Sequence, residues 1–157
     1  MIAMSKKIAL ILPCNRGALE GNYFLGKYWQ TANKSRDPRR ISLGAIDCIP
    51  VLKKNEDDAI VMEWEMERVK GYDVYPQYNE RNISKIAAGI VNGLIRIAQI
   101  FDKIIIMLNV KLYAEATRRA LSQLPKEIRE KIEFIYIPGK PGLFTKKIRE
   151  KIAELQK

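Results

Sequence analysis

The stretch K-I-A-L-I-L-P-C-N-R, residues 7–16, decides the fold that the sequence predicts. Its run of Ile and Leu ends abruptly at Pro13 and is too short for a typical helix, but it suits a strand buried on both faces. Open α/β sheets bind their ligands outside the carboxyl ends of the strands. Cys14, Asn15 and Arg16 therefore lie where a site is expected, although a buried strand with a solvated loop fits the same residues.

Length and composition predict one globular domain over residues 1–157. The chain has 157 residues, of which 47% are apolar, enough to bury a sizeable core. No apolar run reaches the roughly 18 residues of a membrane span. The sequence also lacks the apolar core and cleavage site of a signal peptide. We therefore expect a cytoplasmic protein with no membrane association.

The charge balance favours a polyanionic partner. The formal net charge is +10, from 28 Lys and Arg against 18 Asp and Glu. Nucleic acid is the first candidate for a partner of so basic a chain. The alternative is a lysine-rich surface of the kind that many thermophile proteins have.

The chain has no histidine and two cysteines, Cys14 and Cys48. The lack of histidine excludes His-based triads, imidazole acid–base steps and the common zinc sites, and the cysteines form no CxxC pair. Chemistry would have to use carboxylates, lysine, cysteine, tyrosine or the substrate itself. Cys14 could be a nucleophile if Arg16 lowers its pKa, whereas a small buried thiol is the simpler interpretation. The sequence predicts no particular cofactor.

The first half of the chain continues with a short helix within residues 21–34 and a loop at residues 35–40 that contains three arginines. Aromatic side chains of this helix and the arginines could stack bases and hold phosphates. Equally, the aromatics could pack on the sheet beside a solvated basic loop. A strand is predicted at residues 41–52.

Residues 61–69 alternate Met and Trp with glutamate, which is the period of a strand with one solvent face. Together with the turn-like residues 53–58, this pattern predicts a β-hairpin with the preceding strand. Glu63, Glu65 and Glu67 could bind a divalent metal through oxygen, but a solvent-exposed face is the simpler interpretation.

Residues 71–82 predict a long loop with three tyrosines, one proline and two acids. Long irregular loops in compact domains are often functional. Asp73 and Glu80 could act as acid and base or as polar contacts, and Tyr72 and Tyr75 could contact a substrate. Asp73 could equally be a turn residue that bonds its own backbone.

The second half of the chain predicts several helices. Apolar residues recur at helical spacing from Ile83 to Phe101, and Asn79 or Asn82 can cap this helix. Asn109 can cap the next helix, Pro125 fits the first position of a short one, and the chain ends in another amphipathic helix.

Two further buried strands are predicted at residues 102–109 and 133–137. Strands that alternate with helices predict right-handed parallel crossovers. The expected fold class is α/β, a three-layer Rossmann-like sandwich. Its parallel core sheet contains the first strand and these two, and the hairpin at one edge makes the sheet mixed.

Each of the three core strands ends in residues that include a cation: residues 14–16, 109–111 and 139–142. Each end also precedes a helix N-terminus, which favours an anion. If these strands lie side by side, their ends share one crevice. The candidate substrate-binding residues there are Asn15, Arg16, Asn109, Lys111 and Lys140. Neither a Walker loop nor a GxGxxG loop is present.

Three short segments occur in an order that suggests a family: P-C-N at 13–15, S-L-G-A-I-D-C-I-P at 42–50 and G-Y-D-V at 71–74. Together they resemble the central domain of archaeosine synthase, which also occurs in paralogues of archaeal tRNA-guanine transglycosylase. The resemblance covers roughly residues 7 to 125. It implies a fold related to the uracil-DNA glycosylases and a role in tRNA modification at a deazaguanine base.

The sequence departs from this family in its catalytic segment. The family has a lysine, a proline and a tyrosine shortly after P-C, and then a histidine. Residues 16–23 here read R-G-A-L-E-G-N-Y, and histidine is absent. The resemblance therefore implies binding of a base or nucleotide more strongly than the reaction of the synthase. The acidic stretch at 61–69 is a second departure.

Three hypotheses for function follow. The first is a nucleic-acid-associated protein that binds or modifies tRNA at a deazaguanine base. The second is a metal-dependent nuclease or nucleotide hydrolase that uses Glu63, Glu65, Asp73 or Glu80. The third is a non-catalytic RNA-binding subunit that serves a partner modification enzyme. A metal requirement would favour the second hypothesis, and RNA binding without turnover would favour the third.

Overall fold

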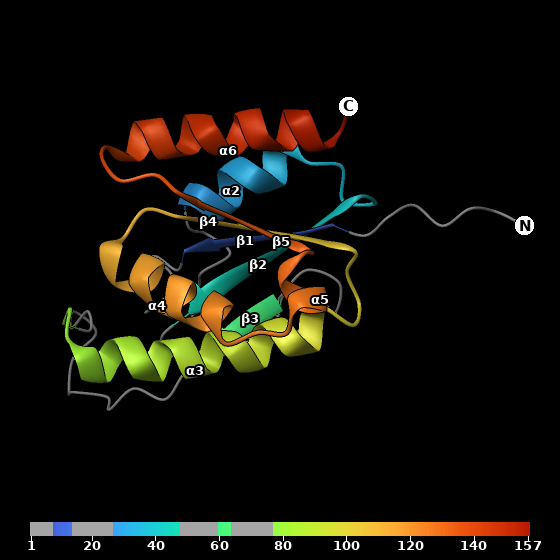
Figure 1. Ribbon diagram of the computed structural model, residues 1–157. Coiled ribbons are helices and arrows are strands. Elements are labelled where there is room, and N and C mark those ends of the chain that lie inside the picture. The colour runs from blue at the N-terminus through green and yellow to red at the C-terminus, as the bar shows by residue number, and fades with distance from the viewer. Residues whose placement is uncertain (1–7, 14–26, 48–59, 64–76) are drawn as a thin grey trace, which may run out of the picture.

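The computed structural model of the chain describes residues 8–13, 27–47, 60–63 and 77–157 (Figure 1). These residues contain a five-stranded sheet in the order β3-β2-β1-β4-β5. Every neighbouring pair in this sheet is parallel. The strands are β1 (Ile8–Pro13), β2 (Ile41–Asp47), β3 (Ile60–Glu63), β4 (Lys103–Leu108) and β5 (Ile132–Tyr136).

Helices cover both faces of the sheet, so the described residues form three layers (Figure 1). They are α2 (Lys27–Ser35), α3 (Glu80–Ile97), α4 (Lys111–Ser122), α5 (Lys126–Arg129) and α6 (Pro141–Leu155). The helices α2 and α6 lie on one face, and α3 and α4 lie on the other. Right-handed crossovers explain this division, because the chain leaves β1 toward one edge and β4 toward the other.

The strand β1 contributes to both cores. Ile8, Leu10 and Leu12 pack with α2 and α6, while Ala9 and Ile11 pack with α3 and α4. All of β1 is buried, which confirms the prediction made from residues 7–16. Full burial of each Ile or Leu side chain contributes about 1.5–3 kcal/mol, so this strand anchors both layers of helices.

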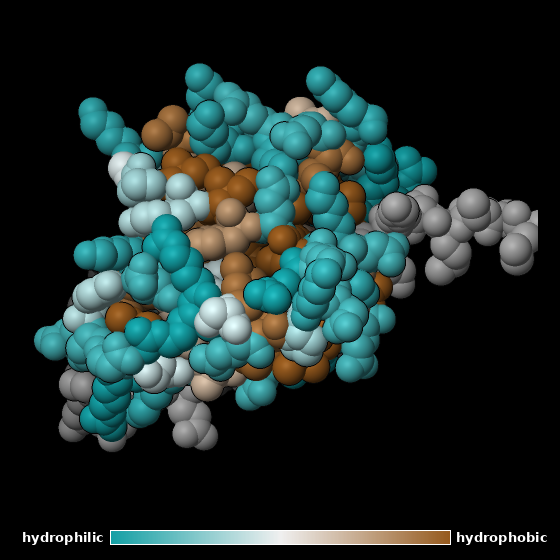
Figure 2. Space-filling view, in the orientation of Figure 1, coloured by the Kyte–Doolittle hydropathy of each residue, from teal (hydrophilic) through white to brown (hydrophobic). Residues whose placement is uncertain are grey.

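The outer surface of α6 is largely hydrophilic (Figure 2), while its inner stripe is buried. Phe144, Ile148 and Ile152 from that stripe pack against Trp29 and Ala32 of α2. The predicted terminal amphipathic helix is therefore confirmed. Among the helices of the described residues, none has the length and apolar character needed to cross a bilayer.

The predicted α/β class and the three-layer Rossmann-like arrangement are confirmed, but the predicted hairpin is wrong. The strands β2 and β3 are neighbours, yet they are parallel, with Gly44 paired to Ile60 and Asp47 to Glu63. The sheet is therefore parallel throughout the described residues and not mixed. Alternation with period two identifies a strand but not its direction. Residues 48–59 are also long enough for the crossover that parallel strands require.

Two predicted helix caps have different outcomes. Asn79 caps α3, because its side-chain oxygen accepts a hydrogen bond from the Asn82 amide at 2.8 Å. The predicted loop at 71–82 therefore ends earlier than expected, and α3 begins at Glu80. The prediction that Asn109 caps α4 is wrong, since Val110 occupies the N-cap position.

The arginine-rich loop at residues 35–40 connects α2 to β2 and binds the end of α6. Arg40 donates hydrogen bonds to the carbonyl oxygens of Gln156, at 2.8 Å, and Leu155, at 3.4 Å. A cation is favourable at a helix C-terminus. Arg36 donates to the first carbonyl of β2 at 2.9 Å. Two of the arginines considered for phosphate binding thus hold the fold together at the amino end of β2.

The turn between β5 and α6 needs a glycine at one position. Gly139 has a φ of 119°, a conformation that residues with a side chain rarely adopt. We expect Gly139→Ala to lower the free energy of unfolding by about 1–3 kcal/mol, measured by urea denaturation. Gly142→Ala is the matched control, because a Cβ added there meets no atom within 4 Å and alanine favours the helix. Equal losses in both variants would contradict this account of the turn.

Candidate functional site at the carboxyl edge of the sheet

The order of the strands places the candidate site between β1 and β4. These strands are adjacent and parallel, with Ile8 paired to Lys103 and Ile11 to Ile106. From them the sheet extends outward through β2 on one side and β5 on the other. Ligands of open α/β sheets bind at such a reversal of strand order, outside the carboxyl ends. Asn109, which directly follows β4, lies at this point, and β5 lies beside β4 as predicted.

Asn109 joins three elements at this edge. Its side-chain nitrogen donates a hydrogen bond to the Tyr28 hydroxyl at 2.9 Å. The Tyr28 ring meets the ring of buried Phe144 edge to face, with centroids 4.8 Å apart and planes at 77°. Tyr28 belongs to the first turn of α2 and Phe144 to the first turn of α6. The amide is therefore held in place by an aromatic pair from two helices.

The side-chain oxygen of Asn109 is buried and has no hydrogen-bond partner among the described residues. Buried polar atoms of native proteins are generally hydrogen-bonded, because leaving one unpaired costs about 1–3 kcal/mol. An amide oxygen at a switch point is suited to accept an N–H or O–H group of a ligand. The edge of a nucleobase carries such donors.

Lys111 and Tyr78 form a second feature of this edge. The Lys111 ammonium lies 4.7 Å from the centroid of the Tyr78 ring, a cation–π contact. The Tyr78 side chain remains exposed, at 51%. An exposed ring beside a cation can stack a base and hold a neighbouring phosphate. Sequence reasoning noted three tyrosines in this loop and selected Tyr72 and Tyr75, so it missed the one whose placement the structure describes.

At the N-termini of α4 and α6, the N-cap side chain accepts no hydrogen bond from the backbone N–H groups of the first turn. The N-cap residues are Val110 and Lys140, and neither side chain can accept a hydrogen bond. The helices α2, α3, α4 and α6 all begin at this edge (Figure 1), so the positive ends of their dipoles face the same side. Lys140 is exposed there. Anions are therefore favoured at this edge.

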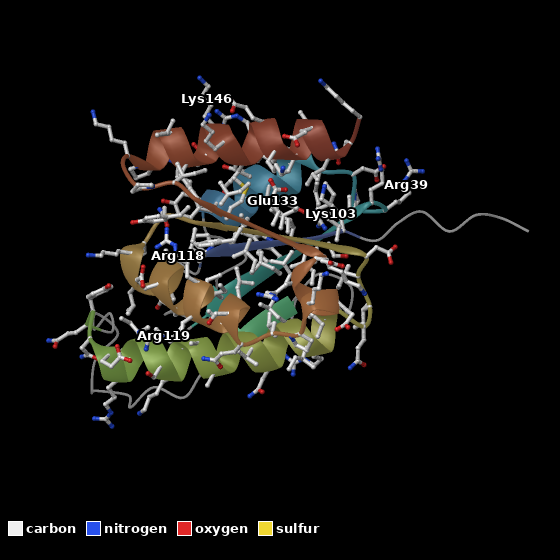
Figure 3. The ribbon with its side chains drawn as sticks, in the orientation of Figure 1. Arg39, Lys103, Arg118, Arg119, Glu133 and Lys146 are labelled. Atoms are coloured by element: carbon white, nitrogen blue, oxygen red, sulfur yellow. The ribbon has the colours of Figure 1, made fainter. Side chains whose placement is uncertain are left out.

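Glu80, a predicted catalytic residue, is part of an ion pair. Its carboxylate accepts hydrogen bonds from both terminal nitrogens of Arg119, one of them at 3.1 Å, and one from the Ser84 hydroxyl at 3.3 Å. The hydrogen bond from Arg119 lowers the pKa of the Glu80 carboxyl. Figure 3 shows Arg119 between α4 and α3. This geometry favours a role in joining the two helices, since an ionised, paired carboxylate is a poor proton donor.

The remaining predicted site residues lie outside the described residues. These are Cys14, Asn15, Arg16, Tyr72, Asp73 and Tyr75. Of the substrate-binding candidates, the structure thus places Asn109, Lys111 and Lys140, and it brings all three to the carboxyl edge. Within the described ranges, no three His, Cys, Asp or Glu side chains are grouped so as to hold a metal ion.

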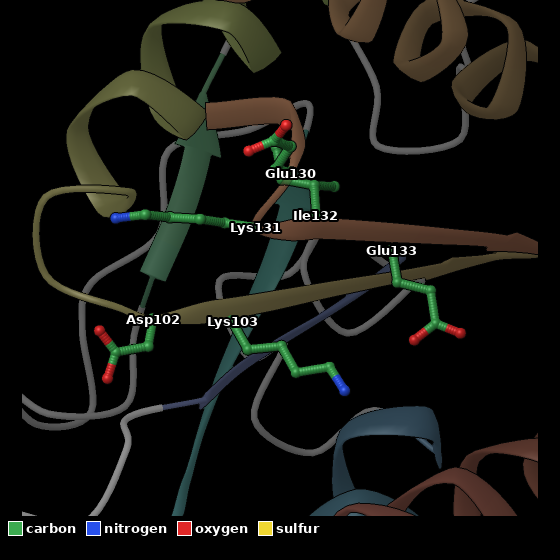
Figure 4. Close-up of a pocket in the computed structure, with 6 residues that line it drawn as sticks. All are labelled: Asp102, Lys103, Glu130, Lys131, Ile132 and Glu133. Carbon is green, nitrogen blue, oxygen red and sulfur yellow. The ribbon is translucent and has the colours of Figure 1, made fainter. Parts of the chain in front are cut away.

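A cavity of about 250 Å³ lies at the opposite, amino edge of the sheet (Figure 4). It is lined by Asp102, Lys103, Glu130, Lys131, Ile132 and Glu133. Two of its polar groups are already engaged, because Lys131 donates to the carbonyl oxygen of Ala98 at 2.8 Å and Glu133 pairs with Lys151 at 2.8 Å. Its mixture of acids and bases favours no single class of ligand, and we do not place the functional site there.

Comparison of the chain with known protein families, with curated proteins and with solved structures finds no match. The resemblance to the archaeosine synthase domain therefore stays a prediction.

Proposed function

We propose that this chain binds tRNA through the carboxyl edge of its sheet, in the deazaguanine modification that the sequence resemblance implies. The observation that carries the proposal is the position of Asn109. It lies at the switch point of the sheet, where a buried amide oxygen without a partner among the described residues is available to a ligand. Nucleotide ligands commonly bind at this position in open α/β sheets.

The residues around Asn109 could contact the other parts of a nucleotide, namely the face of its base and its phosphate. Tyr78 offers an exposed ring, and Lys111 beside it offers a cation. Lys140 offers a second cation at the N-terminus of α6. Stacking of an unpaired base on an aromatic ring contributes about 1–3 kcal/mol, and the lysines can contact the phosphates on either side.

The overall charge supports a nucleic acid over a free nucleotide. A formal charge of +10 attracts a polyanion over distances that exceed direct contact. Single-stranded loops are the usual targets of base-specific RNA recognition, because their bases can be splayed out and stacked. The proposed ligand is therefore an unpaired nucleotide in folded RNA. Turnover by this chain, through Cys14 or Asp73, remains a prediction, and a partner enzyme could supply the chemistry instead.

Binding of tRNA should weaken steeply as salt is raised. Each lysine that neutralises a phosphate releases a condensed counterion. If Lys111 and Lys140 each contact a phosphate, a plot of log K against log salt should have a negative slope with a magnitude of about 1.4 or more. Fluorescence anisotropy with labelled tRNA, between about 50 and 200 mM salt, measures this slope. A duplex DNA of similar length is the control and should bind more weakly. No binding of tRNA at low salt would refute the proposal.

A further inference from the structure

The strand β5 differs from the other strands in its exposure. It lies at the edge of the sheet, and all five of its residues are only partly buried, whereas β1 and most of β4 are fully buried. Figure 2 shows apolar atoms on the face that β5 crosses, between the layer of α6 and that of α4. Apolar surface along a sheet edge is a candidate contact surface.

No strand of the described residues lies on the outer side of β5. The Lys131 carbonyl accepts a hydrogen bond from the Ile104 amide, and the Ile137 amide donates to the Leu108 carbonyl, each at 2.8 Å. Since backbone groups alternate in direction along a strand, odd-numbered residues bond β4. The N–H and C=O groups of Ile132, Phe134 and Tyr136 therefore point outward. Among the described residues, no strand pairs with them.

Within β5 there is no lysine and no proline, two of the residues that normally prevent edge pairing. Natural edge strands are protected by lysine, proline, bulges or inward-pointing charges. The sequence of β5 is I-E-F-I-Y, and its one charged residue, Glu133, pairs at 2.8 Å with the buried Lys151 on α6. On the opposite face, the Arg118 guanidinium lies over the rings of Tyr136, at 5.3 Å, and Phe134, at 5.7 Å.

We propose that β5 pairs antiparallel with β5 of a second copy of this chain, about a two-fold axis at Phe134. In this register Phe134 lies opposite itself and Ile132 lies opposite Tyr136. Every outward N–H and C=O group of the three residues then has a partner, because the pattern is self-complementary. The backbone groups of β5 could pair with any strand, so the preference for a second copy rests on the side chains that this register brings together.

The side chains fit the same register on both faces of the joined sheet. Toward α4, Ile132, Phe134 and Tyr136 of the two copies form one apolar row, and cross-strand apolar pairs of this kind are stabilising. Toward α6, Glu133 lies opposite Ile135, so the two carboxylates do not face each other directly. The inference rests on the edge of the sheet and is independent of the proposed binding of tRNA.

The first test measures the mass of the full chain by sedimentation equilibrium. We expect a reversible dimer, and we expect Tyr136→Lys to raise its dissociation constant by about tenfold or more, because it replaces an aromatic contact of the interface by a charge in both copies. Tyr78→Lys is the control, because it makes the same change of charge at an exposed tyrosine that lies outside β5. A wild-type chain that is monomeric at every concentration would overturn the proposal. So would equal dissociation constants for Tyr136→Lys and the wild type.

The second test determines the register, in a background with Cys14→Ser and Cys48→Ser. Hydrogen-bonded antiparallel pairs have Cα atoms about 5.5 Å apart, within reach of a disulfide. Phe134→Cys should therefore cross-link two copies on oxidation, and the double variant Ile132→Cys with Tyr136→Cys should do the same. Ile132→Cys alone should not. Cross-linking by Ile132→Cys alone, or by neither of the other variants, would overturn the register.

Salt separates this dimer from two copies bridged by nucleic acid. The proposed interface is apolar and hydrogen-bonded, and copies of a +10 chain repel one another less as salt screens their charge. Raising salt should therefore leave the dissociation constant unchanged or lower it. Dissociation at high salt would contradict the β5 interface.

Discussion

Replacing Lys111 and Lys140 together by glutamate is expected to reduce the affinity for tRNA by about a hundredfold. Both side chains are exposed, and they lie beside the N-termini of α4 and α6 at the carboxyl edge. Each change removes a phosphate contact and adds a repulsive charge, which we take as about tenfold in affinity. The magnitude of the salt slope should also fall, by about 0.7 for each lost contact. Anisotropy titrations at several salt concentrations measure both effects.

A matched control keeps the same change in net charge but moves it to the other edge. Lys103 and Lys126 are exposed, and they lie at the start of β4 and of α5. Their double replacement by glutamate should weaken binding only through the general field of the protein, and therefore by much less. Equal losses of affinity in the two double variants would mean that tRNA binding depends on net charge alone. The proposal that tRNA binds at the carboxyl edge would then be wrong.

The fold was predictable because its strands are marked by burial. The apolar runs at the start of the chain and at residues 102–109 became the two central strands β1 and β4. The run at 133–137 also became a strand, but the prediction that it is a buried core strand is wrong, because β5 lies at the edge of the sheet and is only partly buried. A strand covered by helices on both faces has to be apolar at every position, so the pattern survives in the sequence. The direction of β3 left no such mark, because an alternating pattern is the same in either direction.

The candidate site was predictable only in part, because its contacts join residues far apart in the chain. Asn109 had the residue type and position of a helix cap. It bonds the hydroxyl of Tyr28 instead, 81 positions away. Glu80 likewise pairs with Arg119, 39 positions away. The alternation of strands and helices predicts which strand ends meet. It does not predict which side chains will form hydrogen bonds or ion pairs with one another there.

Tyr78 is a site residue that the sequence did not single out, because its contact also comes from a distant part of the chain. It directly precedes the cap residue Asn79, and its ring becomes prominent only because α4 brings Lys111 against it. The topology that brings the N-termini of α3 and α4 to one edge is what makes this pair. Once the strand order is known, exposed aromatic residues just before helices at the carboxyl edge become the natural candidates for contact with a base.

Phe144→Ala is expected to lower the free energy of unfolding by about 3–5 kcal/mol. The side chain is 1% exposed and is among the largest that are fully buried. It packs in the core formed by α2, α6 and one face of the sheet, and it supports the ring of Tyr28. Alanine would leave a cavity between the two helices. Because the total stability of a domain is typically about 5–15 kcal/mol, the midpoint of urea denaturation should fall sharply.

The neighbouring Leu143 provides the control for this variant. Its side chain is 44% exposed, so Leu143→Ala should change the free energy of unfolding by about 0.5 kcal/mol or less. Phe144→Leu, which keeps most of the apolar volume, should lose less than Phe144→Ala. Since Phe144 supports Tyr28, and Tyr28 orients Asn109, the leucine variant should also bind tRNA more weakly while remaining folded. If Phe144→Ala were no less stable than Leu143→Ala, the packing of α6 against α2 described here would be wrong.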